Sequence, residues 1–198
     1  MRILNILRFG FSFIVLFMLV SIVGFAQDKV EKEERIREKE VPRIAQEWLY
    51  DAFEKVKRPK WYKEFSDSGY SFEAKFQYDD HFHSVEFDSL GNILDVEIEM
   101  DWSELKQEVR SSIGNYFGEK YKVHKLIKIQ IQYSGEEEDL EDFFDEDENE
   151  GILIQYEIEF SGIDLTGDSR IWEGTFDSRG NFLSLRIIRV LEMANVIF

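Results

Sequence analysis

The sequence predicts an α+β fold. In it, a tandem duplication of a helix plus a four-stranded antiparallel meander forms one continuous antiparallel sheet, with two helices packed on one face. The first observation is a six-residue phrase at residues 87–92 that returns at residues 176–181 with five identical positions, 89 residues later. That spacing is too long for a solenoid repeat and suits a duplicated half-domain. The second observation is the alternating apolar pattern on both sides of each copy, which predicts a β-hairpin with Asp opening the turn and Gly closing it.

Residues 1–26 have the pattern of a cleaved export signal. Arg2 and Arg8 form a positive start, residues 9–23 are uncharged and largely apolar, and Gly24-Phe25-Ala26 fits a small-x-small cleavage site. An uncleaved membrane anchor is the alternative. We therefore expect a periplasmic or secreted protein with no stable membrane insertion after cleavage.

The composition excludes several classes of protein. The chain has no cysteine, which rules out disulfides and a lipid-modified cysteine at the cleavage point. Its formal net charge of −17 argues against nucleic acid and anionic membranes as partners. The negative charge is compatible with a partner that has a basic patch and with a divalent cation. Eighteen phenylalanines indicate a well-formed core.

The first half follows the predicted order of one helix and four strands. Residues 27–41 are a charged leader, solvated or helical through Glu/Lys pairs. The first repeat spans 42–101, and apolar residues at helical spacing after Pro42 predict its helix, which Pro59 ends. Period-two alternation then predicts strands at 61–65, 70–78, 81–88 and 92–101.

The second repeat, 102–198, has the same order with one insertion. We expect a helix from Ser103 to about Gly118, and strands at 123–133 and 152–160 followed by a turn and a last hairpin. The insertion, 134–151, is acidic: eleven of the residues from 136 to 150 are Asp or Glu, which predicts a mobile loop. The apolar end, Val196-Ile197-Phe198, is expected to dock.

Several local features occur in an order that resembles a known family. They are Val41-Pro42 opening a helix, Pro59-Lys60-Trp61 starting a strand, Tyr70 with alternating aromatics, Phe87-Asp88 with Gly91, a second helix, Tyr156-Glu157, and Phe176-Asp177 with Gly180. The set resembles the PepSY-like, β-lactamase-inhibitor-like family of exported Bacteroidetes-type proteins and covers 41 to about 190. The resemblance implies two α-plus-four-strand units in one sheet, and binding or inhibition by analogy of fold. The chain departs from the family in Trp102-Ser103 at its second helix and in its acidic insertion.

No catalytic motif is present in the sequence. There is no nucleophile elbow, phosphate-binding glycine loop or His-Glu-x-x-His, and the chain has only three histidines. We therefore predict a protein that is not an enzyme and needs no cofactor.

Two weak metal candidates remain. His81 and His83 lie two apart on a strand and point the same way, but a zinc site needs three or four ligands and the sequence places no third. Asp145, Asp147 and Asn149 are spaced like the first ligands of a calcium loop, yet the bidentate glutamate is missing. A polar hairpin end and a solvated loop are the plainer interpretations, so no metal site is predicted.

The sheet face opposite the helices is the candidate functional surface. Strand alternation places acidic residues and some aromatic residues there. The alternative is that this face is simply the solvated face of an antiparallel sheet, which has a similar composition without any function. The predicted partner surface is Glu73, Phe82, Glu86, Asp95, Glu97, Glu99, Glu157, Glu159, Glu173 and Phe182. We expect a non-enzymatic exported binding module that meets a basic protein or peptide. The alternative is an envelope protein that responds to divalent cations through residues 136–150.

Overall fold

The structure, a computed structural model, describes residues 28–29, 32–66, 69–146 and 150–188. Within these residues the strands form one ten-stranded sheet in the order β1-β10-β9-β8-β7-β6-β5-β4-β3-β2. The strands are β1 (Asp28–Lys29), β2 (Lys32–Ile36), β3 (Lys60–Ser66), β4 (Gly69–Tyr78), β5 (His81–Phe87), β6 (Ile93–Glu99), β7 (Tyr121–Ser134), β8 (Leu153–Asp164), β9 (Ser169–Asp177) and β10 (Phe182–Ile188). Strands β2 to β10 are antiparallel to their neighbours, and β1 pairs with β10 in parallel.

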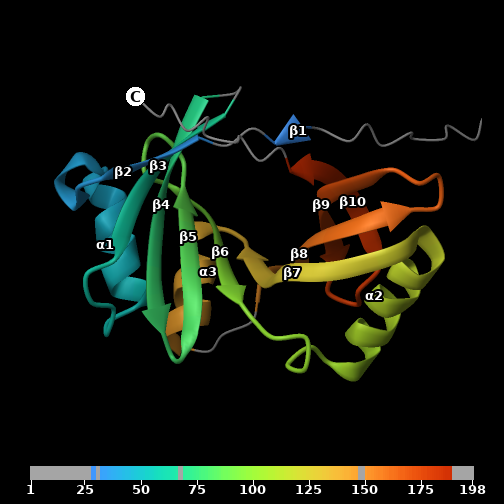
Figure 1. Cartoon of the computed structure of the whole chain (residues 1–198). Coiled ribbons are helices and arrows are strands. Elements are labelled where there is room, and N and C mark those ends of the chain that lie inside the picture. The colour runs from blue at the N-terminus through green and yellow to red at the C-terminus, as the bar shows by residue number, and fades with distance from the viewer. Residues whose placement is uncertain (1–27, 30–31, 67–68, 147–149, 189–198) are drawn as a thin grey trace, which may run out of the picture.

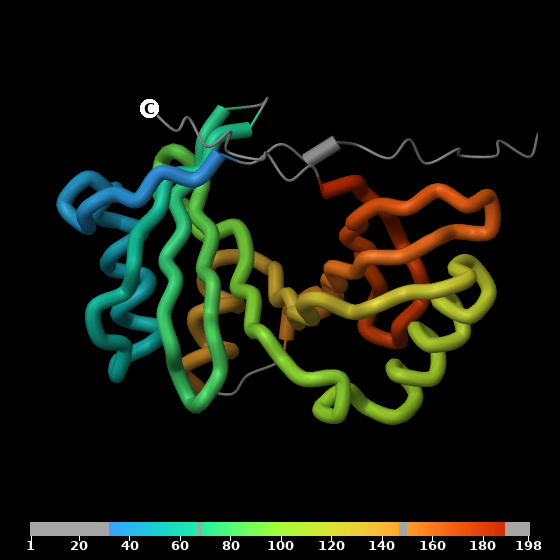
Figure 2. The backbone as a smooth tube through the Cα atoms, viewed as in Figure 1, coloured from blue at the N-terminus to red at the C-terminus, as the bar shows by residue number. Residues whose placement is uncertain are grey.

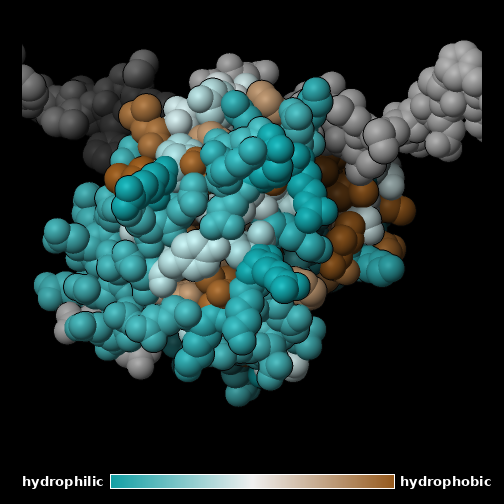
Figure 3. Space-filling model, turned by 90° about the vertical axis from the view of Figure 1, so that its left-hand side faces the viewer, coloured by the Kyte–Doolittle hydropathy of each residue, from teal (hydrophilic) through white to brown (hydrophobic). Residues whose placement is uncertain are grey.

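The helices pack on one face of this sheet. They are the short 3-10 helix η1 (Glu38–Glu40), α1 (Arg43–Ala52), α2 (Gln107–Lys120) and α3 (Glu137–Glu146). In Figure 1, α1 and α3 lie beside β3–β6, and α2 lies beside β7–β10. Seen from the α1 side, the outer surface consists mostly of hydrophilic side chains (Figure 3). The α+β class and the antiparallel sheet agree with the prediction.

The sheet is strongly curved. Strands β1 and β2 are two residues apart in the sequence, yet they pair with β10 and β3 on opposite sides of the sheet. Three residues of chain span at most about 11 Å, so the Cα atoms of Lys29 and Lys32 cannot lie farther apart than that. The two sides of the sheet must therefore approach each other at this end. The tube in Figure 2 shows the resulting bend between β3–β6 and β7–β10.

Each half of the sheet has its own apolar core. In the first, Trp48 of α1 meets Phe87 of β5 edge-on, with ring centroids 5.9 Å apart. In the second, Phe117 of α2 meets Phe160 of β8 in the same way at 4.7 Å. Burial of these large rings supplies much of the energy that holds the helices on the sheet.

The two repeated phrases form turns with the same hydrogen bonds. The amide of Asp88 donates to the carbonyl of Asn92 (2.8 Å), and the amide of Asp177 donates to that of Asn181 (2.9 Å). Each Asp side chain also accepts from the amide four residues later, at 2.9 Å in both turns. The strands before the turns are paired in matching register, Phe72 opposite Phe87 and Tyr156 opposite Phe176.

Each turn also touches the helix of its own half. Gly91 and Gly180 have positive φ values of 98° and 79°, a conformation that favours glycine. A Cβ on Gly91 would lie 2.5 Å from Cγ2 of Ile44 in α1, and one on Gly180 would lie 2.7 Å from the carbonyl oxygen of Val109 in α2. Glycine is therefore required both for the turn and for close approach of turn and helix.

Residues 32–41 of the charged leader, 27–41, are largely exposed, as expected of a solvated segment, but 32–36 are extended and paired in the sheet, so the helical prediction was wrong there. Residues 32–36 form strand β2, which pairs along its whole length with β3, and η1 follows. Burial of side chains contributes little to the formation of β2, because this strand is mostly exposed. The open edge of β3 presents unpaired backbone groups, and a neighbouring extended segment satisfies them.

The acidic insertion, 134–151, was predicted to be a mobile loop, and this was wrong for most of its length. Residues 137–146 form α3, whose Leu140 is fully buried (0% exposed) in the first core. Phe144 meets Phe53 with ring centroids 5.0 Å apart, and Trp48 donates to the carbonyl of Glu137 at 3.4 Å. The reason is the spacing of Leu140, Phe143 and Phe144, which makes one apolar stripe among the acids. Acidic residues in the first turn also suit the helix dipole.

Other boundaries shifted by a few residues. Helix α2 begins at Gln107 rather than Ser103, because the amides of Asp101 and Glu104 bond across a separate turn before it. It also runs past Gly118 to Lys120. The predicted export signal and the predicted docking of Val196-Ile197-Phe198 lie outside the described residues.

We expect Leu140→Ala to lower the free energy of unfolding by about 2–4 kcal/mol, because it leaves a cavity between α3 and the first core. Leu165→Ala is the matched control, since Leu165 is 59% exposed in a turn, and its effect should stay within about 0.5 kcal/mol. Urea denaturation followed by circular dichroism measures both. Equal effects would mean that α3 is not docked.

Candidate functional site

The concave face of the sheet, opposite the helices, holds a hollow of about 790 Å³. We call it the acidic groove. Among the described residues, ten Asp or Glu side chains line it against three Lys or Arg. The acids are Glu33, Glu64, Glu73, Glu86, Asp95, Glu97, Glu99, Glu157, Glu159 and Glu173, and the bases are Lys75, Lys128 and Arg186.

Strand register brings these charges into rows across the sheet. Glu73 of β4 lies opposite Glu86 of β5, which lies opposite Asp95 of β6, so three acids stand side by side. A second row crosses the other half, where Glu159 lies between Lys128 on β7 and Glu173 on β9. Acids directly opposite one another repel, so the first row needs outside compensation.

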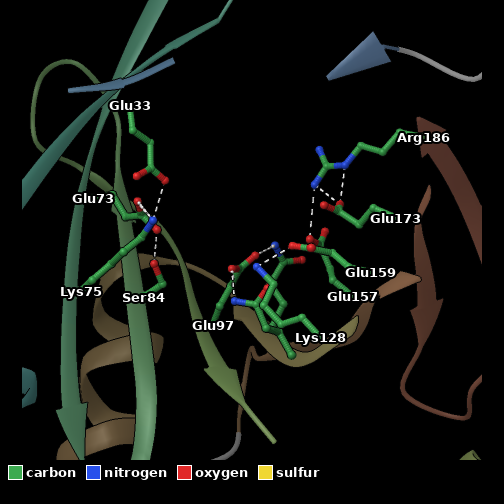
Figure 4. Close-up of polar contacts among 12 residues, drawn as sticks. Glu33, Glu73, Lys75, Ser84, Glu97, Lys128, Glu157, Glu159, Glu173 and Arg186 are labelled. Carbon is green, nitrogen blue, oxygen red and sulfur yellow. Dashed lines mark hydrogen bonds and ion pairs between the residues drawn. The ribbon is translucent and has the colours of Figure 1, made fainter. Parts of the chain in front are cut away.

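One cation serves the β2–β4 side of the groove. The ammonium of Lys75 lies 2.5 Å from Oε1 of Glu33 and 2.8 Å from Oε2 of Glu73. The hydroxyl of Ser84 donates to the other oxygen of Glu73. Figure 4 shows these four side chains converging on one wall. Burial opposes the charge of Lys75, but the carboxylates of Glu73 and Glu33 outweigh it and raise the lysine pKa.

Arg186 and Lys128 are the other two cations of the groove. Arg186 of β10 donates to Glu173 and, at 3.2 Å, to Glu157. Lys128 of β7 lies 2.7 Å from Glu159. In Figure 4, Arg186 and Glu173 face the Lys75 group across the hollow, and Glu97 and Lys128 lie between the two walls.

The floor acids have neutral hydrogen-bond partners. Glu86 accepts from the hydroxyl of Ser71 at 2.7 Å. Glu97 accepts from the amide of Gln130 at 2.7 Å, and Asp95 from that of Gln132 at 3.4 Å. Hydroxyls and amides stabilise a carboxylate without cancelling its charge, so Glu86 and Asp95 stay negative when they ionise.

Burial and the close approach of carboxylates raise the pKa values of several acids in the groove. Burial, then the neighbouring Glu73, raises the pKa of Glu64 to about 9. Burial, then Glu97 and Glu86, raises the pKa of Asp95 to about 8. Burial and the nearby Glu173 likewise raise the pKa of Glu157 to about 8, against the attraction of Arg186. Part of the groove is therefore protonated near neutral pH.

Nine of the ten predicted surface residues line the groove, and Phe182 does not. Phe182 stacks on Tyr116 of α2, with ring centroids 4.6 Å apart and planes at 9°, and so faces the helices. The reason is a register shift in β10 between Phe182 and Ser184, which breaks the simple alternation. A similar shift between Glu86 and Phe87 lies opposite Ile93, which packs against the first core.

The sequence missed two acids of the groove, Glu33 and Glu64. Glu64 lies on β3, where the alternation of residues 61–65 predicts its face. Glu33 lies on β2, inside the segment predicted to be a leader, and no sequence signal placed it on a sheet.

Among the described metal candidates, the rings of His81 and His83 have different partners. His83 is buried among aromatic rings and stacks on Phe76 at 5.5 Å, and burial lowers its pKa. His81 contacts Glu104 at 2.9 Å. Asp145 is exposed near the end of α3, whereas Asp147 and Asn149 lie outside the described residues.

In the part of the chain that the structure covers, three carboxylates alone bring ligand atoms together closely enough for a metal ion, Glu33, Glu64 and Glu73, within 4.8 Å of one another. Their cation is already present as the Lys75 ammonium, which contacts two of them. This cluster therefore carries no metal assignment.

Comparisons with known proteins show a shared fold. No family model and no curated protein matches the chain. A DUF2874 family protein from Bacteroides ovatus matches 80% of this chain and 94% of its own, with a TM-score of 0.52 and 12% identity. A DUF2874 family protein from Bacteroides uniformis covers 74% and 89%, with a TM-score of 0.51 and 13% identity. A candidate periplasmic protein from Bacteroides eggerthii covers 74% and 88%, with a TM-score of 0.52 and 10% identity.

The chain has the fold of these Bacteroides proteins. A BLIP-like protein from Bacteroides fragilis is also similar, at 18% identity and a TM-score of 0.46 over 74% of this chain and 86% of that one. In the described ranges every helix is too short or too polar to span a bilayer. At these identities the likeness concerns architecture, and function must be argued from the groove.

Stability should fall as pH rises from about 5 to 8. The pKa values of Asp95 and Glu157 are raised from 3.8 and 4.5 to about 8, so in this range the folded protein holds protons that the unfolded chain has released. Their contribution is complete below the unfolded pKa values and is lost as pH passes the folded ones. Urea denaturation across this range measures the slope.

The variant Asp95→Asn/Glu157→Gln should flatten that slope. Its control is Glu108→Gln/Glu119→Gln, which removes the same charge from exposed positions on α2. An unchanged slope in the groove variant would contradict the assignment.

Proposed function

We propose that this protein is a non-enzymatic, exported binding module whose acidic groove binds a protein or peptide through a basic patch. The observation that carries the proposal is the confinement of ten acids with three bases on one concave face. Lys and Arg side chains of a partner entering this face would meet carboxylates from both walls at once.

The electrostatics of the floor favours a cationic partner. Asp95 and Glu86 stand opposite each other and receive hydrogen bonds from neutral side chains. An arriving ammonium or guanidinium group supplies the missing positive charge. Protonated carboxyls such as Asp95 would then release protons, because a nearby cation favours the charged form.

The lining favours a peptide segment over a small organic ligand. Small-molecule sites are mostly apolar with a few polar groups. This groove is the reverse, since its walls and floor consist mainly of charged and amide side chains. Such a surface suits several basic side chains presented together on a chain.

Export and family origin belong to the same proposal. Export to the periplasm or beyond rests on the signal pattern of residues 1–26. Tandem duplication is supported by the equivalent hydrogen bonds of Asp88 and Asp177 and by matching register before each turn. A PepSY-like origin rests on the ordered sequence features alone.

Reversing charge in the groove tests the proposal. Glu97→Lys/Glu159→Lys should weaken binding of a fluorescent oligolysine peptide by at least about tenfold, because it adds repulsion on the floor and one wall. Fluorescence anisotropy at low and high salt measures this, together with capture of envelope proteins.

The control Glu108→Lys/Glu119→Lys makes the same change of net charge on the exposed face of α2. Equal loss in both variants would show only a general charge effect, and no binding by the wild type would refute the proposal.

A response to divalent cations through residues 136–150 is the second candidate. Helix α3 crowds acids against α1, and burial, then Asp51 and Asp142, raises the pKa of Glu141. We expect millimolar calcium to raise the melting temperature of the wild type but not of Asp51→Asn/Glu141→Gln, while oligolysine binding stays the same in both. A melting temperature insensitive to calcium would remove this candidate.

A further inference from the structure

A second hollow, of about 630 Å³, adjoins the acidic groove. It lies where β5, β6 and β7 meet the turn before α2, and Met100 and Trp102 form part of its lining. Phe82, Glu99 and Lys128 line both hollows, so the two form a continuous surface.

Two apolar side chains in this second hollow are unusually exposed. Phe82 is 60% exposed and Ile127 is 51% exposed. Phe82 faces outward because its neighbour His83 points into the first core, and alternation along β5 puts residue 82 on the other face. Ile127 sits at a register shift between Leu126 and Lys128, where β7 bulges and the residue has no partner on β8.

The rim of the second hollow is acidic. Asp80, Asp101, Glu104 and Glu99 line it and outnumber the basic groups there, Lys128 and His81, of which His81 contacts Glu104. An occupant must therefore be apolar at its centre and positive at its margins. Both an anionic lipid surface and an acidic peptide would be repelled.

We infer that the binding segment is amphipathic: its basic residues lie in the acidic groove, and an adjacent apolar residue packs on Phe82 and Ile127. This inference rests on the proposed function and adds what the partner must carry beside its charge. Aromatic residues, phenylalanine included, are enriched in protein interfaces relative to the rest of the surface. Both hollows are complementary to positive charge and share part of their lining, which indicates that one continuous segment of the partner occupies both.

Three labelled peptides test the inference with the purified protein. The first places one Phe among Lys residues, the second replaces that Phe with Ser, and the third keeps the Phe but replaces every Lys with Glu. We expect the wild type to bind the Phe/Lys peptide about tenfold more tightly than the Ser/Lys peptide, because burial of one aromatic side chain is worth at least that much. The Phe/Glu peptide should not bind.

Phe82→Ser should abolish the tenfold preference, so that the variant binds the Phe/Lys and Ser/Lys peptides equally. Leu90→Ser is the matched control, since Leu90 is 73% exposed in the turn after β5 and lines neither hollow. Equal binding of both Lys peptides to the wild type would overturn this inference and leave the proposed function standing. Failure of both to bind would overturn the proposed function itself.

Sedimentation velocity gives an independent check. A wild-type protein that is a dimer, and that Phe82→Ser converts to a monomer, would show that a second copy covers the patch and would overturn the inference. A monomer in both cases is the expected result.

Discussion

The structure depends on one constraint, which is that like charges are held together on the concave face of a curved sheet. Glu73, Glu86 and Asp95 stand side by side on neighbouring strands, and burial keeps water from screening them. Apolar burial on the opposite face offsets this repulsion, because both cores are built from large rings and aliphatic side chains. Lys75 and Arg186 neutralise part of each wall, and protonation relieves part of the rest.

The curvature that creates the groove follows from where the helices and turns sit. Each helix covers its own half of the sheet, and each glycine turn lies against the start of that helix, so the two halves are separately fixed. The short connection between β1 and β2 then limits how far the two sides of the sheet can separate. A flat sheet with the same sequence would spread its acids and lose the groove.

The shared fold with Bacteroides proteins and the groove contribute differently to the functional argument. The fold likeness, at 10% to 13% identity, describes architecture. The groove supplies chemistry, since a concave surface with excess negative charge selects partners by charge before shape. The exposed Phe82 and Ile127 beside it then add a requirement that charge alone does not set. Specificity on such a surface arises from charge complementarity and apolar contact together.

The sequence by itself determined the helix and the four strands of each half and the position of nine of the ten predicted surface residues on the open face, because alternation and turn chemistry are local properties. The tertiary structure decided the rest. Leu140 makes α3 a packed helix only because α1 offers a core to receive it, and β2 forms only because β3 has an open edge. Phe182 changed faces through a register shift in β10. The groove itself depends on the bend that brings distant strands together, and no local pattern encodes that distance.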